Sequence, residues 1–223
     1  MQLSTLFFTI CGLSLIYADD FETEYNNLLI DNLIAGKIKK HINELEPLRI
    51  QNYTYEFNRR WAFGLLPLKG HAKLEDIELH GLSTIQRIGP VKFSSPDEAS
   101  KGLEIVFEVT NLTHSMTGNA RLGLLNSERN FTGHIKLVEF HLYVKHSKAR
   151  DEVYVQRLML TKLDGLDVQV IGGYRINDWL TRQLITRAHR YLQSASKYAI
   201  EFYMTHMFNV VLSGDKSIKY ILS

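Results

Sequence analysis

The feature that most constrains the fold is a long segment near the C-terminus that contains neither glycine nor proline. It runs from Asn177 or Asp178 to about Leu212, and Gly214 follows as a stop signal. Apolar residues recur there at helical spacing, at Leu180, Leu184, Ala188, Leu192, Ala195, Ala199 and Phe202. Further aromatic residues broaden this stripe. A helix of about 50 Å with so wide an apolar surface needs another layer wrapped around it.

A second amphipathic helix is predicted near the N-terminus, from Asp20 to Glu46. Its stripe consists of Ile30, Ile34, Ile38, Ile42 and Leu45, and Pro47 ends it. The spacing of four, four, four and three residues is typical of a helix with one buried face.

Between the two helices the chain reads as a meander of short strands. Residues 103–109 alternate apolar and polar side chains, and Ala120, Leu122 and Leu124 repeat this pattern in a separate run. Residues 126–129 have the composition of a turn. The run from Phe131 to Val144 changes parity near Leu137, and residues 153–160 and 163–170 add two more candidate strands. The short connections favour antiparallel pairing.

Helix, antiparallel strands and a long helix predict an α+β fold, with residues 19–223 forming a single domain. A strongly curved sheet wrapped around the C-terminal helix leaves room for an apolar pocket. Strand parity and the helix stripe predict that this pocket is lined by Leu74, Ile77, Leu79, Ile105, Phe107, Leu122, Leu124, Ile135, Phe140, Leu158, Leu160, Leu184, Leu192 and Phe202.

The first eighteen residues predict a secretory signal peptide. They carry no charged side chain and are mostly apolar, and Ala18 is a small residue at a plausible cleavage position. An uncleaved anchor is the alternative, although the apolar stretch is short for a membrane span. The only cysteine, Cys11, leaves with this segment, so the core alone must hold the secreted chain together. Three sequons predict glycosylation at Asn52, Asn111 and Asn130.

The sequence offers no recognisable catalytic machinery. There is no G-x-S-x-G elbow, no H-E-x-x-H motif and no glycine-rich phosphate loop. Glu75, Asp76 and Glu78 can be interpreted as an acid/base pair, but their alternation with Ile77 and Leu79 favours a solvated strand face. We therefore predict no catalytic residue, no metal site and no cofactor. A formal charge of +2 without a dense basic patch argues against nucleic-acid binding.

Residues 68–89, LKGHAKLEDIELHGLSTIQRIG, slip by one position within an alternating run. Leu68, Gly70, Ala72 and Leu74 hold one parity, and Ile77, Leu79 and Gly81 hold the other. A slip of one residue sends every later side chain to the opposite face unless a β-bulge absorbs it. We therefore predict a bulge or sharp bend at Glu75 and Asp76.

The same stretch resembles the corresponding segment of the mite group 7 allergens. The shared features are Leu68-Lys69-Gly70, the run to Ile77 and Leu79, Gly81-Leu82, and Arg87 followed by an apolar residue and Gly89. The resemblance implies the super-roll fold of the wider class that contains bactericidal/permeability-increasing protein, takeout and juvenile-hormone-binding proteins. It also implies a pocket for lipid-like ligands. The takeout branch typically carries an N-terminal disulfide, and its absence here favours the group 7 side.

The resulting hypothesis is a secreted, non-enzymatic binder or carrier of lipid-like or other hydrophobic small molecules. An alternative is a protein of innate immunity that recognises a membrane surface or bacterial lipid, which the basic segments 37–41 and 145–150 favour. A secreted enzyme is the third hypothesis, and only the histidine and carboxylate content supports it.

Overall fold

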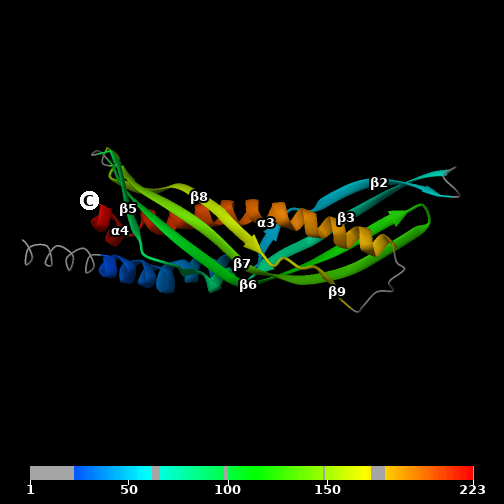
Figure 1. Ribbon diagram of the computed structural model, residues 1–223, viewed down its shortest axis with the longest axis horizontal. Coiled ribbons are helices and arrows are strands. Elements are labelled where there is room, and N and C mark those ends of the chain that lie inside the picture. The colour runs from blue at the N-terminus through cyan, green and yellow to red at the C-terminus, as the bar shows by residue number, and fades with distance from the viewer. Residues whose placement is uncertain (1–22, 62–65, 98–99, 148, 172–178, 223) are drawn as a thin grey trace, which may run out of the picture.

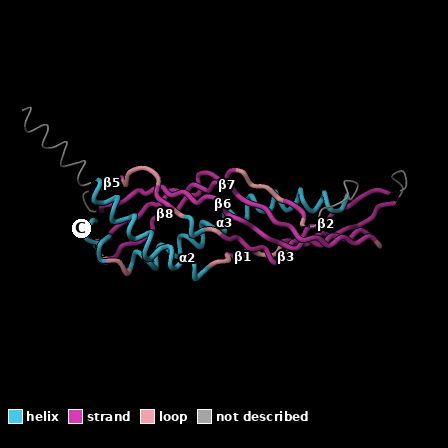
Figure 2. Tube along the Cα trace, turned by 90° about the horizontal axis from the view of Figure 1, so that it is seen from below, coloured by secondary structure: helices cyan, strands magenta, loops and turns pink. Residues whose placement is uncertain are grey.

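The protein is an elongated roll in which a long helix lies against a curved antiparallel sheet (Figure 1). A computed structural model describes residues 23–61, 66–97, 100–147, 149–171 and 179–222. The N-terminal and C-terminal helices and the long strands run along the same axis, which Figure 2 shows from below. The predicted α+β class, with its sheet wrapped around the C-terminal helix, is confirmed.

The sheet contains nine strands and is antiparallel throughout. The strands are β1 (Leu48–Ile50), β2 (Tyr53–Trp61), β3 (Leu66–His80), β4 (Gln86–Arg87), β5 (Lys92–Asp97), β6 (Ser100–Leu122), β7 (Leu125–Ser147), β8 (Glu152–Asp164) and β9 (Gln169–Val170). The main order is β1-β3-β6-β7-β8, while β2 pairs with β3, β4 and β5 pair with β6, and β9 pairs with β7. The β6–β7 hairpin is therefore the spine that joins both ends of the roll.

This hairpin differs from the strands that the sequence predicts. Each of its strands has 23 residues, about 75 Å when extended, and the two apolar runs belong, as far as Leu122, to one strand, β6. The predicted turn at 126–129 lies inside β7, and the chain reverses instead at Gly123 and Leu124, with Gly123 at φ 59°. Long-range pairing with β6 overrides the local turn composition of residues 126–129.

Both spine strands exchange their faces at the same level. In β7 the buried positions change from Phe131 and Ile135 to Val138 and Phe140, which confirms the predicted change of parity near Leu137. In β6 the change occurs at Asn111, whose φ is 55°, and the pairs on either side keep one register. The inner face therefore stays apolar along the whole hairpin although the sheet bends there.

A β-bulge in β3 confirms the prediction for residues 75–76. The pairing with β6 shifts between Glu75 and Glu78, so β3 has one more residue here than β6, and Asp76 has a φ of 50°. As a result, Leu74 and Ile77 are both buried although they differ in parity. The bulge keeps the apolar face of a bent strand turned toward the core.

The helix α3 (Trp179–Ser213) presents a buried stripe that winds around its axis. The stripe consists of the positions at a strict spacing of four, namely Leu180, Leu184, Ala188, Leu192, Ser196, Ile200, Met204, Phe208 and Leu212, and all of them are buried. Four residues exceed one helical turn by about 40°, so the stripe rotates along the helix. The predicted stripe departs from it at Ala195, and Phe202 consequently lies on the exposed side, 60% accessible.

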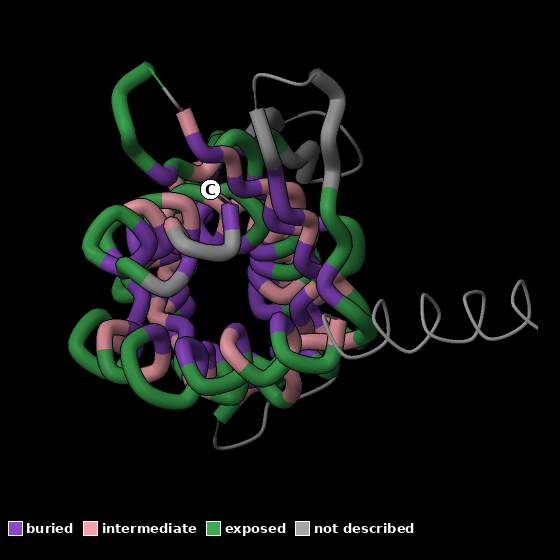
Figure 3. The backbone as a smooth tube through the Cα atoms, turned by 90° about the vertical axis from the view of Figure 1, so that its left-hand side faces the viewer, coloured by how far each residue is buried: buried purple, intermediate pink, exposed green. Residues whose placement is uncertain are grey.

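Side chains of α3 join it to both edges of the sheet. At one edge, Glu201 Oε1 accepts a hydrogen bond from Leu160 N and Asn209 Oδ1 accepts one from Val155 N, both at 2.8 Å, on β8. At the other edge, the Tyr191 hydroxyl donates to Gln51 O at 2.7 Å, beside β1. The helix thereby closes the roll, and segments with buried residues surround its long axis (Figure 3).

The N-terminal segment covers one end of the roll. It is helical from residue 23 to 33, continues as a π-helix (Ile34–Ile38) and ends with α2 (Lys39–Leu45). The predicted stripe is buried from Ile30 to Ile42, whereas Leu45 is largely exposed. An ion pair of 2.7 Å between Lys37 Nζ and Asp215 Oδ2 connects this segment to the turn before α4 (Lys216–Leu222). A 3₁₀ turn (Leu82–Thr84) follows β3.

Candidate ligand-binding groove

An apolar groove of about 260 Å³ lies between α3 and β1. Its helix wall consists of Tyr191, Ala195, Tyr198, Ala199, Phe202 and Tyr203, and its strand wall consists of Arg49, Ile50 and Gln51. Ala195 and Ala199 are one turn apart on the same face of α3, where their short side chains leave space that the neighbouring rings surround. The groove is slightly smaller than typical sites for drug-sized ligands, so it matches a slender apolar chain.

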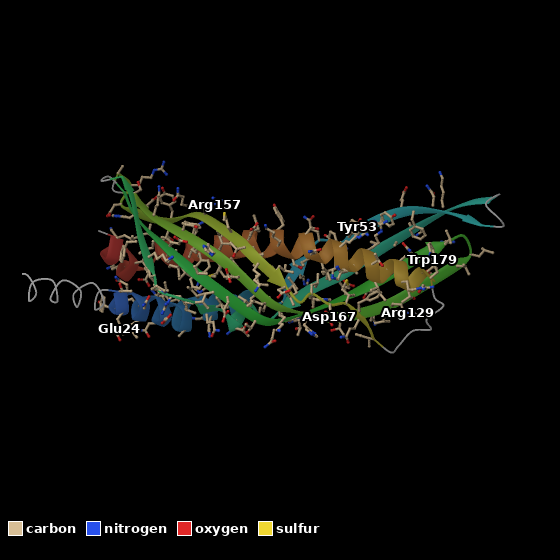
Figure 4. All side chains as sticks on the ribbon, in the orientation of Figure 1. Glu24, Tyr53, Arg129, Arg157, Asp167 and Trp179 are labelled. Carbon is tan, nitrogen blue, oxygen red and sulfur yellow. The ribbon has the colours of Figure 1, made fainter. Side chains whose placement is uncertain are left out.

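Aromatic rings mark the two ends of this groove. At one end, the rings of Tyr53 and Tyr191 stack with their centroids 4.4 Å apart, and Figure 4 places Tyr53 beside α3. At the other end, Tyr198 and Phe202 stack at 6.3 Å, and Tyr203 meets Phe202 edge to face at 5.7 Å. Tyr198 is 72% exposed. Exposed rings next to an apolar groove offer a ligand a large contact area at small entropic cost.

Tyr203 also lines a small void on its inner side. This void, of about 10 Å³, has walls from Ile42, Leu45, Leu48, Leu82, Met204 and Met207 in addition to Tyr203. Methionine side chains are unbranched and adapt readily to a changed cavity. The groove therefore ends at a ring that is backed by a small void with two methionine side chains in its wall.

The predicted pocket residues divide into three groups. Twelve of them are buried in the interior of the roll, namely Leu74, Ile77, Leu79, Ile105, Phe107, Leu122, Ile135, Phe140, Leu158, Leu160, Leu184 and Leu192. None of these lines the groove. Phe202 does line it, but from the exposed side of α3. The expectation for Leu124 is wrong, because this residue lies in the β6–β7 turn and is 101% exposed.

The sequence interpretation missed most of the groove. Part of the helix wall could have been predicted from the sequence. Two alanines at a spacing of four, Ala195 and Ala199, stand beside Tyr191 and Tyr198 on a helix otherwise rich in long side chains. Ile50 carries no such signal, because only the fold brings this residue next to a helix that begins more than a hundred positions later.

A histidine side chain is fully enclosed in the roll. His114, on the inner face of β6, is 1% exposed, and its Nε2 lies 2.7 Å from Asp167 O. Its Nδ1 is buried without a partner among the described residues. Burial lowers the pKa of His114 below its ordinary value, and the hydrogen bond to Asp167 opposes this only partly.

The lowered pKa of His114 leads us to expect that the free energy of unfolding depends on pH in a specific way. Because its folded-state pKa is depressed, the neutral ring stabilises the fold fully above pH 6.5, and this contribution is lost as the pH falls below that value. Urea unfolding at pH 7.5 and 5.5 should therefore show a smaller loss of stability at pH 5.5 for His114→Gln than for the wild type. Equal losses in the two proteins would contradict this assignment.

The described residues contain no group of three or more His, Cys, Asp or Glu side chains placed to hold a metal ion. Within the same part of the chain, no helix is both long and apolar enough to cross a membrane. The three sequon residues, Asn52, Asn111 and Asn130, are exposed, so glycosylation remains a prediction that their positions permit. The predicted signal peptide lies outside the described residues.

Comparison with solved structures returns proteins of similar shape at low identity. The lipopolysaccharide-binding protein is 13% identical, with a TM-score of 0.47, and the match covers 78% of this chain and 37% of that one. Takeout 1 of Epiphyas postvittana is 16% identical, with a TM-score of 0.34, and the match covers 80% of this chain and 79% of that one. The chain thus spans little more than a third of the lipopolysaccharide-binding protein. A search of curated proteins finds no match.

A comparison with family models is decisive for classification. The model of the Group 7 allergen family matches residues 25–212, which is most of the 223-residue chain. The match includes the stretch 68–89, on which the resemblance rests, together with the groove and both of its walls. This chain therefore belongs to the group 7 allergen family.

Proposed function

We propose that this protein is a secreted, non-enzymatic carrier of lipid-like or other hydrophobic small molecules, which bind in the groove between α3 and β1. The observation that carries the proposal is the groove itself, where Ala195 and Ala199 open an apolar space between aromatic rings. Burial of a ligand's apolar surface there supplies roughly 25 cal/mol per Å². The predicted signal peptide and the exposed sequons support secretion and glycosylation.

The contacts of α3 with β8 differ from its contacts with β1, and the difference favours ligand entry beside β1. At β8, Glu201 and Asn209 hold the helix to backbone N–H groups, and breaking these bonds would leave partly buried polar groups unpaired. Beside β1, the groove walls meet through apolar and aromatic surface, with Tyr191 bonded to Gln51 at one end. A ligand chain can separate α3 from β1 without breaking a backbone ladder.

Filling the groove is expected to abolish most of the binding. In Ala195→Trp the indole occupies the space of the ligand chain, and the loss of roughly 60–80 Å² of apolar contact lowers affinity by more than tenfold. The measurement is the Kd of a fluorescent fatty-acid analogue. Ser194→Trp is the matched control, because this neighbouring residue is exposed and does not line the groove.

Two results would end the proposal. One is an unchanged Kd in Ala195→Trp, which removes the groove as the site. The other is a wild-type protein that neither binds the analogue nor releases any lipid to organic solvent, as judged by mass spectrometry of repeated extracts.

Recognition of a membrane surface, the alternative hypothesis, has less support from the described residues. Of the basic segment 37–41, Lys37 is paired with Asp215 at 2.7 Å, which partly neutralises the charge that this segment offers to an anionic surface. The carrier is therefore the function that the geometry supports best.

A further inference from the structure

A polar trench of about 490 Å³ crosses the outer face of the sheet at the level of the β3 bulge. It passes from β1 over β3 and β6 to β7. Glu78, Ser115 and Thr117 point outward into it, whereas their neighbours Ile77 and Met116 are buried beneath. The β3 bulge lies in the wall of this trench, because Asp76, whose φ is 50°, falls within the shifted register and lines the trench.

The side chains of the trench have hydrogen-bonding capacity to spare. The Asp76 carboxylate and the Ser115 hydroxyl make no hydrogen bond or ion pair with any described residue. Arg49 Nε and Glu78 Oε1 are 3.4 Å apart, a long contact that leaves most of the guanidinium free. The trench thus presents a hydrogen-bond donor in Arg49, acceptors in the two carboxylates, and hydroxyl groups that can donate and accept. This combination pairs well with the hydroxyl groups of a ligand.

The charge of the trench limits what it can hold. Its lining contains one cationic side chain, Arg49, and two anionic ones, Asp76 and Glu78, so the formal balance is one negative charge. A bare anionic group would meet two carboxylates, which disfavours it. The one aromatic residue in the lining, Phe131, is fully buried, so no ring is available to a quaternary ammonium group.

The trench and the apolar groove meet at β1. Arg49 and Ile50 line both of them, with Arg49 exposed and Ile50 buried. A molecule whose chain lies beside α3 can therefore extend over the edge strand into the trench.

We propose that the ligand of this protein is an amphiphile with an uncharged, sugar-like headgroup. Its apolar chain occupies the groove, and its headgroup hydroxyls bind Arg49, Asp76, Glu78, Ser115 and Thr117 in the trench. This inference rests on the proposed carrier function, since it assigns the polar end of the same ligand. The sequon residues Asn52 and Asn130 stand at the β1 and β7 ends of the trench, so glycans on them would flank the headgroup.

The test compares headgroups on one chain length. Protein produced in the bacterial cytoplasm, where its asparagines stay unmodified, is loaded with a fluorescent fatty-acid analogue. It is then titrated below micellar concentrations with dodecyl maltoside, dodecanoate and dodecylphosphocholine. Dodecyl maltoside should displace the analogue at about tenfold lower concentration than the other two, as two or three additional hydrogen bonds predict.

Matched variants separate the trench from the groove. Ser115→Ala combined with Thr117→Val should lower the affinity for dodecyl maltoside about tenfold and leave the affinity for dodecanoate unchanged. Thr113→Val, an exposed residue on the same strand but outside the trench, should change neither. The headgroup assignment is overturned if the three amphiphiles bind with equal affinity or if a charged headgroup is preferred. It is also overturned if the double variant loses as much affinity for dodecanoate as for dodecyl maltoside. Failure of all three amphiphiles to displace bound analogue overturns this assignment as well, whereas a protein that takes up no analogue contradicts the carrier function instead.

Discussion

Replacement of Phe208 with alanine is expected to lower the free energy of unfolding by about 3–5 kcal/mol. The ring of Phe208 projects from α3 into the centre of one half of the roll. Its centroid lies 5.3 Å from that of Phe107 on β6 and 6.4 Å from that of Phe140 on β7, and all three rings are buried. Alanine leaves a cavity between the helix and both spine strands, and rings held by two long strands relax into it only partly.

Urea unfolding followed by circular dichroism measures this loss. Phe202→Ala is the matched control, since it removes the same side chain from the exposed side of the same helix and should change stability by less than about 1 kcal/mol. A similar destabilisation in both variants would mean that the buried stripe does not wind around α3 as described. An unchanged m-value is needed for the comparison of midpoints.

Gly133→Ala is the second substitution with a large expected effect. A Cβ at this position would lie 2.3 Å from Asp167 O and 2.6 Å from His114 Nε2, two atoms that are themselves joined by a hydrogen bond of 2.7 Å. The backbone of Asp167 cannot move freely, because its N–H donates to His134 O. Overpacking and the loss of a buried hydrogen bond together are expected to cost about 2–4 kcal/mol.

Gly36→Ala is the appropriate control for this substitution. Gly36 is helical, and a Cβ there meets nothing within 4 Å, so alanine should be neutral or stabilise the protein by up to about 1 kcal/mol. Thermal unfolding of both variants provides the comparison. If Gly133→Ala unfolds at the wild-type temperature, the His114 ring and the Asp167 carbonyl do not meet above Gly133 as described.

The general architecture could be predicted because its signals are local. The change from a period of two to a period near 3.6 separates strands from helices, and a one-residue slip at Glu75 and Asp76 indicates a bulge. The continuity of β6 was harder to predict from the sequence. Asn111 and Thr113 interrupt the apolar run of β6, and only its pairing along all of β7 shows that the strand continues.

The candidate site was largely beyond the reach of sequence reasoning. Parity identifies side chains that face inward, and in this fold those side chains pack into a core. The groove arises instead at a seam, where Ala195 and Ala199 on α3 meet Ile50 on β1. No periodic pattern marks a contact between segments so far apart in the chain.

By itself, the amino-acid sequence determined that two amphipathic helices flank a set of one-faced strands along the chain, since each pattern depends on residues a few positions apart. The tertiary structure alone decided which face of α3 is covered at each turn. The strands twist around the helix, so the covered face rotates by about 40° every four residues. For that reason Phe208 is buried between two strands, while Tyr198 and Phe202 remain exposed beside the groove.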